Sequence, residues 1–163
     1  MSLTTAMMTV AEVNSSAIVD SNIDTAYIDQ YILMAQRKFI RPFIGNDYYE
    51  ELTTQIAAST LTADNTTLLD DYIKPALAHY IVYESLPQLR NQIAKGGVYL
   101  NLSDTSDAVS DVGYGQIRTD YVAKAEALRE EIDFYIKDAR KDDSTKYPLY
   151  CGKNSQNTGI IIY

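Results

Sequence analysis

Few residues in this sequence could carry out chemistry, and they lie far apart. His79 is the only histidine, and no second histidine stands at the spacing of a metal site. A Ser-His-Asp triad can draw its members from distant segments, but the Gly-x-Ser-x-Gly turn that exposes a serine in many hydrolases is absent. We therefore expect His79 to be a structural or surface residue.

The other candidates also argue against a catalytic or metal site. Cys151, the only cysteine, excludes a disulfide within the chain, and no basic cluster near it in the sequence would activate its thiol. The run DTSDAVSD (104–111) lacks the alternating oxygen ligands and the glycine turn of a calcium loop. The GYG at 113–115 does not match a phosphate-binding loop, and Glu130 and Glu131 point to different sides of a predicted helix. We expect no catalytic, metal or cofactor-binding residues, and a protein that is not an enzyme.

The amino-acid composition further limits the classes of protein to which this chain could belong. The chain has 163 residues, enough for one domain with a sizeable core, and 46% of them are hydrophobic. Its net charge of −8 disfavours binding to phosphate backbones, so we expect weak or no binding to free DNA. The 14 tyrosines suit half-buried surfaces and interfaces, or simply the edge of the core. The N-terminus does not resemble a signal peptide, and no stretch has the ~20 apolar residues of a membrane span.

Hydrophobic periodicity predicts a mainly α fold, a small bundle of about four principal helices. Residues 24–40 form the first, and NDYYEEL (46–52) opens the second with Asp47 and Glu50 as a capping box. The third, TLLDDYIKPALAHYIVYESL (67–86), is apolar around most of its girth and should occupy the middle of the bundle. We expect Pro75 to bend this helix or mark its first regular turns, and Pro87 to end or kink it.

The fourth predicted helix covers residues 119–141. Its apolar positions alternate steps of four and three, as in an antiparallel bundle: Tyr121, Ala125, Leu128, Ile132, Tyr135 and Ala139. On its polar side, Arg129–Asp133 and Asp133–Lys137 are expected ion pairs.

Three further regions complete the predicted organisation. Residues 1–22 form an N-terminal arm with one short helix, ahead of a bundle domain at 23–146. Within that domain, 93–118 is a projecting hairpin or loop whose short β-strand segment, near 93–103, offers Val98, Tyr99 and Leu100 for contact. Residues 147–163 are predicted to leave the bundle as an extended tail.

The tail ends in the most β-prone tetrapeptide of the chain. We expect it to form a strand against a neighbouring chain, by addition to an exposed sheet edge, because bare isoleucines at a terminus would favour aggregation. A hydrophobic groove on the same subunit is the alternative acceptor. The expected contact residues are Tyr147, Leu149, Tyr150, Ile160, Ile161, Ile162 and Tyr163.

The order of these segments resembles a known family. An arm leads into AYIDQYILMAQRKFIRPFIGNDYYEEL, followed by YIKPALAHYIVYESLPQL, the excursion IAKGGVYLNLS, a last helix and a tail. Over about residues 20–150 this layout resembles the head–tail connector (adaptor or head-completion) proteins of tailed bacteriophages, in particular neck ring proteins of phages that infect Bacteroidetes.

The resemblance implies a structural virion protein, assembled in the host cytoplasm and located in the neck. It would form a homo-oligomeric ring, expected to be twelvefold, between the portal protein and the next neck or tail protein. Genomic DNA would pass through the ring without sequence-specific binding. Two other readings remain open: a bacterial helical adaptor or regulatory module, and an enzyme with a cryptic site. A large closed assembly would favour the connector, and a monomer or dimer the module.

Overall fold

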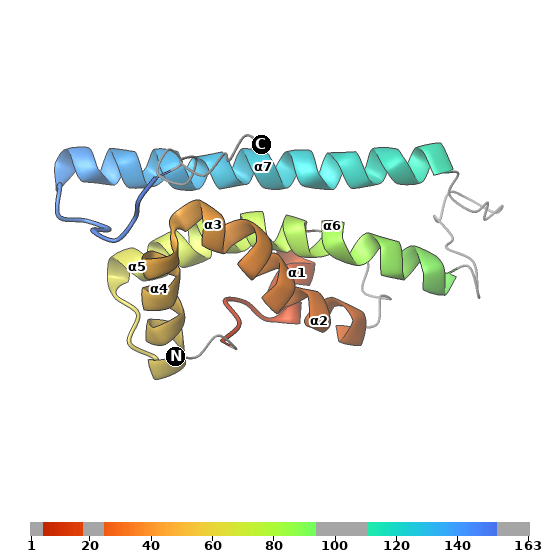
Figure 1. Ribbon diagram of the computed structural model, residues 1–163, viewed down its shortest axis with the longest axis horizontal. Helices are drawn as coiled ribbons and strands as arrows, with labels where there is room; N and C mark the ends of the chain where they lie inside the picture. Colours follow the sequence, from red (N-terminus) through yellow and green to blue (C-terminus); the bar gives the residue numbers. More distant parts are fainter. Residues whose placement is uncertain (1–4, 18–24, 94–110, 153–163) are drawn as a thin grey trace, which may run out of the picture.

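The protein is mainly helical, as the sequence predicts. The computed structural model describes residues 5–17, 25–93 and 111–152 (Figure 1). Within these ranges the elements are α1 (Val10–Ala17), α2 (Thr25–Ala35), the π-helical η1 (Gln36–Ile40), α3 (Arg41–Ile44), α4 (Asn46–Ala58), α5 (Ala63–Thr67), the π-helical η2 (Leu68–Ile73), α6 (Lys74–Ile93) and α7 (Asp111–Asp142).

Local signals fix where the short helices begin. The predicted arm contains α1, which opens with a capping box: Thr9 N–H donates to Glu12 Oε2 at 2.7 Å, and Glu12 N–H donates to Thr9 Oγ1 at 3.3 Å. The capping box predicted at Asp47 and Glu50 is wrong. There α4 begins at Asn46 directly after Gly45, whose φ of 91° supplies the turn without a side-chain cap.

Two prolines follow π-helical turns rather than ending helices. The prolines are Pro42 and Pro75. Each follows an isoleucine and a basic residue, as Ile40-Arg41-Pro42 and Ile73-Lys74-Pro75. In both places the last amide before the proline reaches back five residues, from Arg41 to Gln36 and from Lys74 to Leu69. A proline has no N–H and its ring clashes with the carbonyl four residues earlier, and the wider turn accommodates both features.

The first predicted helix therefore continues past Pro42 as α3, whereas Pro75 does mark the first regular turn of α6. Pro87 does not end its helix, because α6 runs through it to Ile93.

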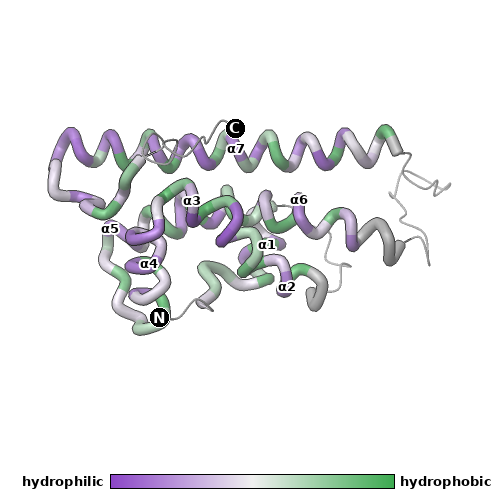
Figure 2. The backbone as a smooth tube through the Cα atoms, viewed as in Figure 1, coloured by the Kyte–Doolittle hydropathy of each residue, from purple (hydrophilic) through white to green (hydrophobic). Residues whose placement is uncertain are grey.

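The central position predicted for the third helix is confirmed. Figure 1 shows α7 lying along α6, with α1 and α2 on the opposite side of α6, and α6 contacts all three. Apolar and polar residues alternate along α7, which presents one face to the bundle and the other outward (Figure 2).

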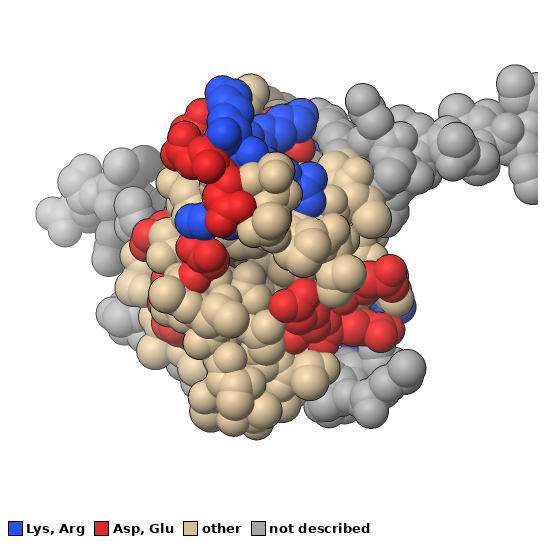
Figure 3. Space-filling model, turned by 90° about the vertical axis from the view of Figure 1, so that its left-hand side faces the viewer, with Lys and Arg blue, Asp and Glu red and all other residues tan. Residues whose placement is uncertain are grey.

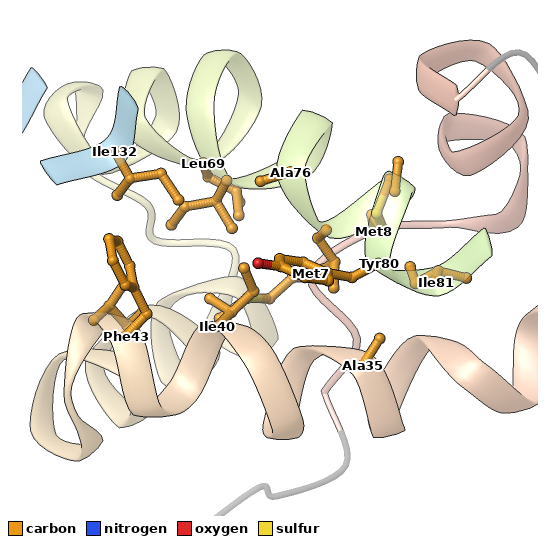
Figure 4. Packing of buried hydrophobic residues seen from close by; sticks show 14 of the residues in the cluster. Met7, Met8, Ala35, Ile40, Phe43, Leu69, Ala76, Tyr80, Ile81 and Ile132 are labelled. Carbon is orange, nitrogen blue, oxygen red and sulfur yellow. The ribbon is translucent and has the colours of Figure 1, made fainter. Parts of the chain in front are cut away.

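The core lies on both sides of α6. Ile132 from α7 lies beside Leu69 of η2, while Met7 and Met8 of the arm meet α6 from the other side (Figure 4). The largest side chains of the core, each less than 2% exposed, are Tyr48, Tyr49, Tyr80, Ile28, Ile32, Ile40, Ile44, Leu52, Leu68, Ile73, Leu77 and Ile81.

The α7 helix starts eight residues before its predicted beginning at 119. Residues 111–118 were expected to belong to a loop because Gly113 and Gly115 are poor helix formers. Packing compensates for them, since the guanidinium of Arg118 lies 4.6 Å from the centroid of the Tyr83 ring on α6. The predicted seam is correct, since all six of its residues are buried or pack against the core.

The predicted strand at 93–103 falls on residues 94–110, outside the described part of the chain, and no strand occurs among the residues that are described. Among those same residues, no helix combines the length and apolar character needed to cross a bilayer.

Candidate functional site

The chain after α7 folds back onto the bundle instead of leaving it. We call residues 143–152 the C-terminal anchor. Its first turn is closed by Asp143, whose carboxylate accepts the N–H of Thr145 at 2.9 Å. Arg140, in the last turn of α7, then donates to the backbone carbonyls of Lys146, Tyr147 and Tyr150. One guanidinium thus organises three carbonyl groups, including that of Tyr147, whose φ of 50° is rare for a residue with a side chain.

Two tyrosine rings fix the anchor in the core. Tyr147 and Tyr150 are each 4% exposed, and both rings meet the ring of Tyr48 edge-on, at centroid distances of 6.1 and 6.5 Å. The Tyr150 hydroxyl donates to the buried carboxylate of Asp133 at 2.8 Å, and the Tyr147 hydroxyl donates to Asp64 O at 3.1 Å. The anchor is therefore bound by packing and by hydrogen bonds.

The prediction of an extended tail from residue 147 onward is wrong for the first residues of that tail. Tyr147 and Tyr150 were expected to contact a neighbour, but the structure places both inside their own bundle because their rings fill space beside Tyr48. Leu149, between them, is 40% exposed and stays available. The other predicted contacts, Ile160–Tyr163 and Val98–Leu100, lie outside the described residues.

The anchor also sets the point from which the last residues begin. A Cβ atom added to Gly45 would lie 3.7 Å from both Cβ and Sγ of Cys151, so the end of the anchor packs against the turn between α3 and α4. The positive φ of Gly45 explains why a glycine occupies that position, since a Cβ atom 3.7 Å from Cys151 would make only an ordinary van der Waals contact. Residues 153–163 therefore start from a defined place on the bundle.

The end of the molecule that carries the anchor has a broad uncharged surface. Figure 3 shows this end, with charged side chains at the top, along the left side and at the right, and uncharged residues over the centre and bottom. No Asp, Glu, Lys or Arg occurs from residue 52 to 63, where the exposed residues are Thr54, Ala57, Ala58, Ser59, Thr60, Thr62 and Ala63. A neutral surface on a chain of net charge −8 lets a second protein approach without repulsion.

One exposed aromatic residue adds to the candidate contacts. Phe134 is 63% exposed on α7, between Asp133 and Tyr135, whose side chains reach Tyr150 and Tyr147 of the anchor. It therefore lies at the level of the anchor along α7 but on the outer face. Exposed aromatic residues are enriched at protein interfaces.

The titratable groups of this region have structural roles. Burial, with the hydrogen bond to Asp133, raises the pKa of Tyr150 far above its usual range, and burial does the same for the pKa of Tyr48 and Tyr147. Burial raises the pKa of Tyr80 to about 12. These phenols are therefore neutral at physiological pH and serve as hydrogen-bonding or packing groups.

The histidine lies elsewhere in the bundle. His79 Nδ1 is 2.9 Å from Pro75 O, and its ring is tilted against that of Tyr121. Within the described ranges, no group of three or more His, Cys, Asp and Glu side chains is placed to hold a metal ion.

Sequence reasoning missed the two residues that organise the anchor. Asp133 was assigned to surface ion pairs, and its pair with Lys137 exists at 2.5 Å, but it is 5% exposed and binds Tyr150. Arg129 pairs with Glu130 at 3.9 Å and lies over the Phe43 ring instead. Arg140 was not singled out, because nothing in the neighbouring sequence distinguishes it from the other charged residues of α7. The Asp-x-Thr at 143–145, a typical turn sequence, was the one local signal that the chain reverses there.

Replacing Arg140 tests the anchor. We expect Arg140→Lys to lower the free energy of unfolding by ~1–3 kcal/mol, because an ammonium group cannot reach three carbonyls at once. The measurement is urea denaturation, with Lys141→Ala as the control because Lys141 is exposed and pairs with exposed Asp138. A loss below ~0.5 kcal/mol would mean that water satisfies these carbonyls equally well.

Comparison with known proteins gives one family. The model described as "Family of unknown function (DUF6712)" matches residues 40–160, from the end of η1 through the anchor and beyond it. No curated protein and no solved structure matches the chain.

Proposed function

This chain belongs to the DUF6712 family, whose function is unknown, and we propose that it is a structural virion protein that forms a head–tail connector ring in the neck of a tailed bacteriophage. The ring would lie between the portal protein and the next neck or tail protein and extend the channel for DNA. The proposal is supported by the resemblance in segment order and by the mainly helical fold. The net charge of −8 would keep the lumen from binding the DNA that passes through it.

The observation that carries the proposal is the C-terminal anchor. It holds the chain through Gly152, so the eleven residues that follow begin at a fixed place and could extend ~36 Å from it. A strand formed by Ile160–Tyr163 on a neighbouring chain would then be delivered from a rigid base. Such tethering raises the local concentration of the strand at its acceptor, so a short contact can hold subunits together. Leu149, Phe134 and the uncharged end surface would add contacts beside it.

Deleting residues 153–163 tests this function. The deletion leaves the anchor intact, so we expect the truncated subunit to keep its helical circular dichroism and its melting temperature but to lose ring assembly or binding to its neck partner. A full-length variant with Ile160, Ile161 and Ile162 changed to Ser should behave like the deletion. Changing Asn154, Ser155 and Gln156 to Gly, which alters only the polar tether, is the matched control and should still assemble.

The readouts are native mass spectrometry and electron microscopy of the native particle. Assembly that survives the deletion would overturn the role of the tail. A full-length chain that stays monomeric with its neck partners present would favour the bacterial adaptor module over the connector.

A further inference from the structure

The N-terminal arm is held through its main chain by one buried glutamine. We call residues 5–17 the arm. Gln36, which is fully buried at the start of η1, accepts the N–H of Met7 at 3.0 Å through Oε1. Its Nε2 donates to Thr5 O at 2.9 Å and to the hydroxyl of Tyr49 on α4 at 2.8 Å. The amide thus binds a donor and an acceptor of the arm backbone, as a neighbouring strand would.

The side chains of the arm are bound as firmly as its backbone. Met7 and Met8 are 2% and 3% exposed in the core, and Val13 and Ala17 of α1 are buried with them. Unbranched methionine adapts its shape to the space that receives it. Figure 4 shows Met7 and Met8 meeting the residues of α6 and η1.

Polar contacts fix the register of α1 on the bundle. Lys74 at the start of α6 binds Glu12 at 2.6 Å and Asp70 at 2.7 Å, with 18% of the lysine side chain exposed. These carboxylates raise the pKa of Lys74 although its burial opposes this, and Lys74 in turn lowers the pKa of Glu12 against the effect of burial. At the end of α1, the Tyr121 hydroxyl on α7 donates to Ala17 O at 3.4 Å. We call Gln36, Tyr49, Lys74 and Tyr121 the arm site.

None of these contacts depends on the arm belonging to the same chain. Each joins residues that are at least 29 positions apart, and the connection to α2 is the segment 18–24. Seven residues span at most ~24 Å, so exchange requires the start of α2 in one copy to lie within about that distance of the end of α1 docked on the next copy. An arm supplied by a second copy would make the same hydrogen bonds, the same ion pair and the same apolar contacts.

We propose that the arm site is an intersubunit docking surface, occupied in an assembly by the N-terminal arm of a second copy of this chain. In an isolated subunit the chain's own arm fills the site, because its effective concentration there is far higher than that of any other arm. When two copies are held side by side, this advantage disappears and the arms exchange. The inference holds for any assembly of adjoining copies and does not require the connector role.

Two charge reversals in the full-length chain make exchange the favoured outcome. In Glu12→Lys the arm and its own site both carry a lysine, and in Lys74→Glu three carboxylates meet, at positions 12, 70 and 74. Each variant alone is therefore mismatched within the chain. When the two variants exchange arms, the lysine introduced at position 12 meets the glutamate introduced at position 74. The native Glu12 of one variant likewise meets the native Lys74 of the other, so both ion pairs are restored at once.

The experiment unfolds and refolds the two variants together at high protein concentration, with tags of different mass. We expect native mass spectrometry to show a dimer containing one copy of each variant, with a melting temperature above that of either variant alone. The double variant Glu12→Lys/Lys74→Glu is the control: it should refold with the native mass and melting temperature of the parent, because the pair is restored within one chain.

The result shows whether the arm binds only its own chain or exchanges with a second copy, even if one variant folds poorly alone. If the double variant folds but joint refolding yields no mixed dimer and no rise in melting temperature, the site accepts only its own arm and the proposal is overturned. Adding Gln36→Leu to both variants should lower the melting temperature of the mixed dimer, because the arm backbone loses its partner in the site. A mixed dimer whose melting temperature does not change with Gln36→Leu would also contradict the proposal, since its contact would not involve the arm site.

Discussion

Raising the pH above about 10 is expected to unfold this protein in a single cooperative transition. Four tyrosines with at most 4% exposure have a raised pKa: Tyr48, Tyr80, Tyr147 and Tyr150. Their common cause is burial, which disfavours the charged phenolate. They tie α4, α6 and the C-terminal anchor to the core, so their ionisation affects the whole bundle.

The sign of the change in stability with pH follows from the numbers of protons that the folded and the unfolded chain bind. Below pH ~10 every phenol is protonated in both the folded and the unfolded chain, so these groups cause no pH dependence. Above it, the unfolded chain releases the protons while the folded chain keeps them, up to about pH 12 for Tyr80 and further for the others. Stability therefore falls as pH rises, by ~1.4 kcal/mol per pH unit for each tyrosine. The four together approach ~5.5 kcal/mol per pH unit, comparable with the whole ~5–15 kcal/mol stability of a typical domain.

Circular dichroism and tyrosinate absorbance, followed together during an alkaline titration, check this expectation. The two signals should change in the same narrow pH range. Tyr80→Phe is the matched variant, because the buried Tyr80 hydroxyl has no hydrogen-bond partner among the described residues. It should keep or gain stability at neutral pH and reduce the alkaline slope by ~1.4 kcal/mol per pH unit.

Tyr150→Phe should differ from Tyr80→Phe by losing stability at neutral pH, since Asp133 then loses the hydroxyl that it binds. Helicity that persists unchanged well above pH 12, or equal neutral-pH effects of the two variants, would contradict this account.

The second large effect is expected from Ile73→Ala. Ile73 is fully buried at the end of η2, where the chain enters the central helix α6. Truncation should lower the free energy of unfolding by ~2–5 kcal/mol, because the lost transfer energy adds to the cost of the cavity. At ~2–4 °C per kcal/mol for a chain near this length, the melting temperature should fall clearly.

Val112→Ala is the control for this cavity, since Val112 is 83% exposed on α7 and should tolerate truncation within ~0.5 kcal/mol. Calorimetry or urea denaturation gives both values. Similar small effects for the two variants would mean that the bundle relaxes around residue 73 and that α6 does not carry the core.

The helices could be predicted because their signal is local. Stripes of apolar residues around Ile73 and Ile132 specify a face wherever the helix lies, and the same stripes identified the central helix. The positions where the helices begin and end were harder to predict from the sequence. Residues 111–118 are helical against the preference of Gly113 and Gly115, because contacts with α6 outweigh a cost of ~1 kcal/mol for each glycine. Such contacts join distant segments and leave no pattern in a window of neighbouring residues.

The candidate site was harder to predict for the same reason. Gln36, Asp133 and Arg140 look like surface residues in their own helices, and only the folded chain brings the arm and the anchor to them. Buried polar side chains with specific partners do not alter the hydrophobic period, so periodicity analysis cannot find them. The tyrosine excess was compatible with an interface or with the edge of the core, and Tyr147 and Tyr150, which were predicted to contact a neighbour, are core residues with hydroxyl partners.

The two π turns have a consequence for how this family can change during evolution. Each contains one more residue than the α-helical turn that it replaces, next to a proline that needs the wider turn. A homologue could therefore lose one residue within 36–40 or 68–73 together with the following proline, and the flanking helices would keep the same faces toward the core. Deletions elsewhere in these helices would rotate the buried stripe by ~100° toward solvent. Single-residue gaps in an alignment of relatives should thus concentrate at these two turns and coincide with loss of the proline.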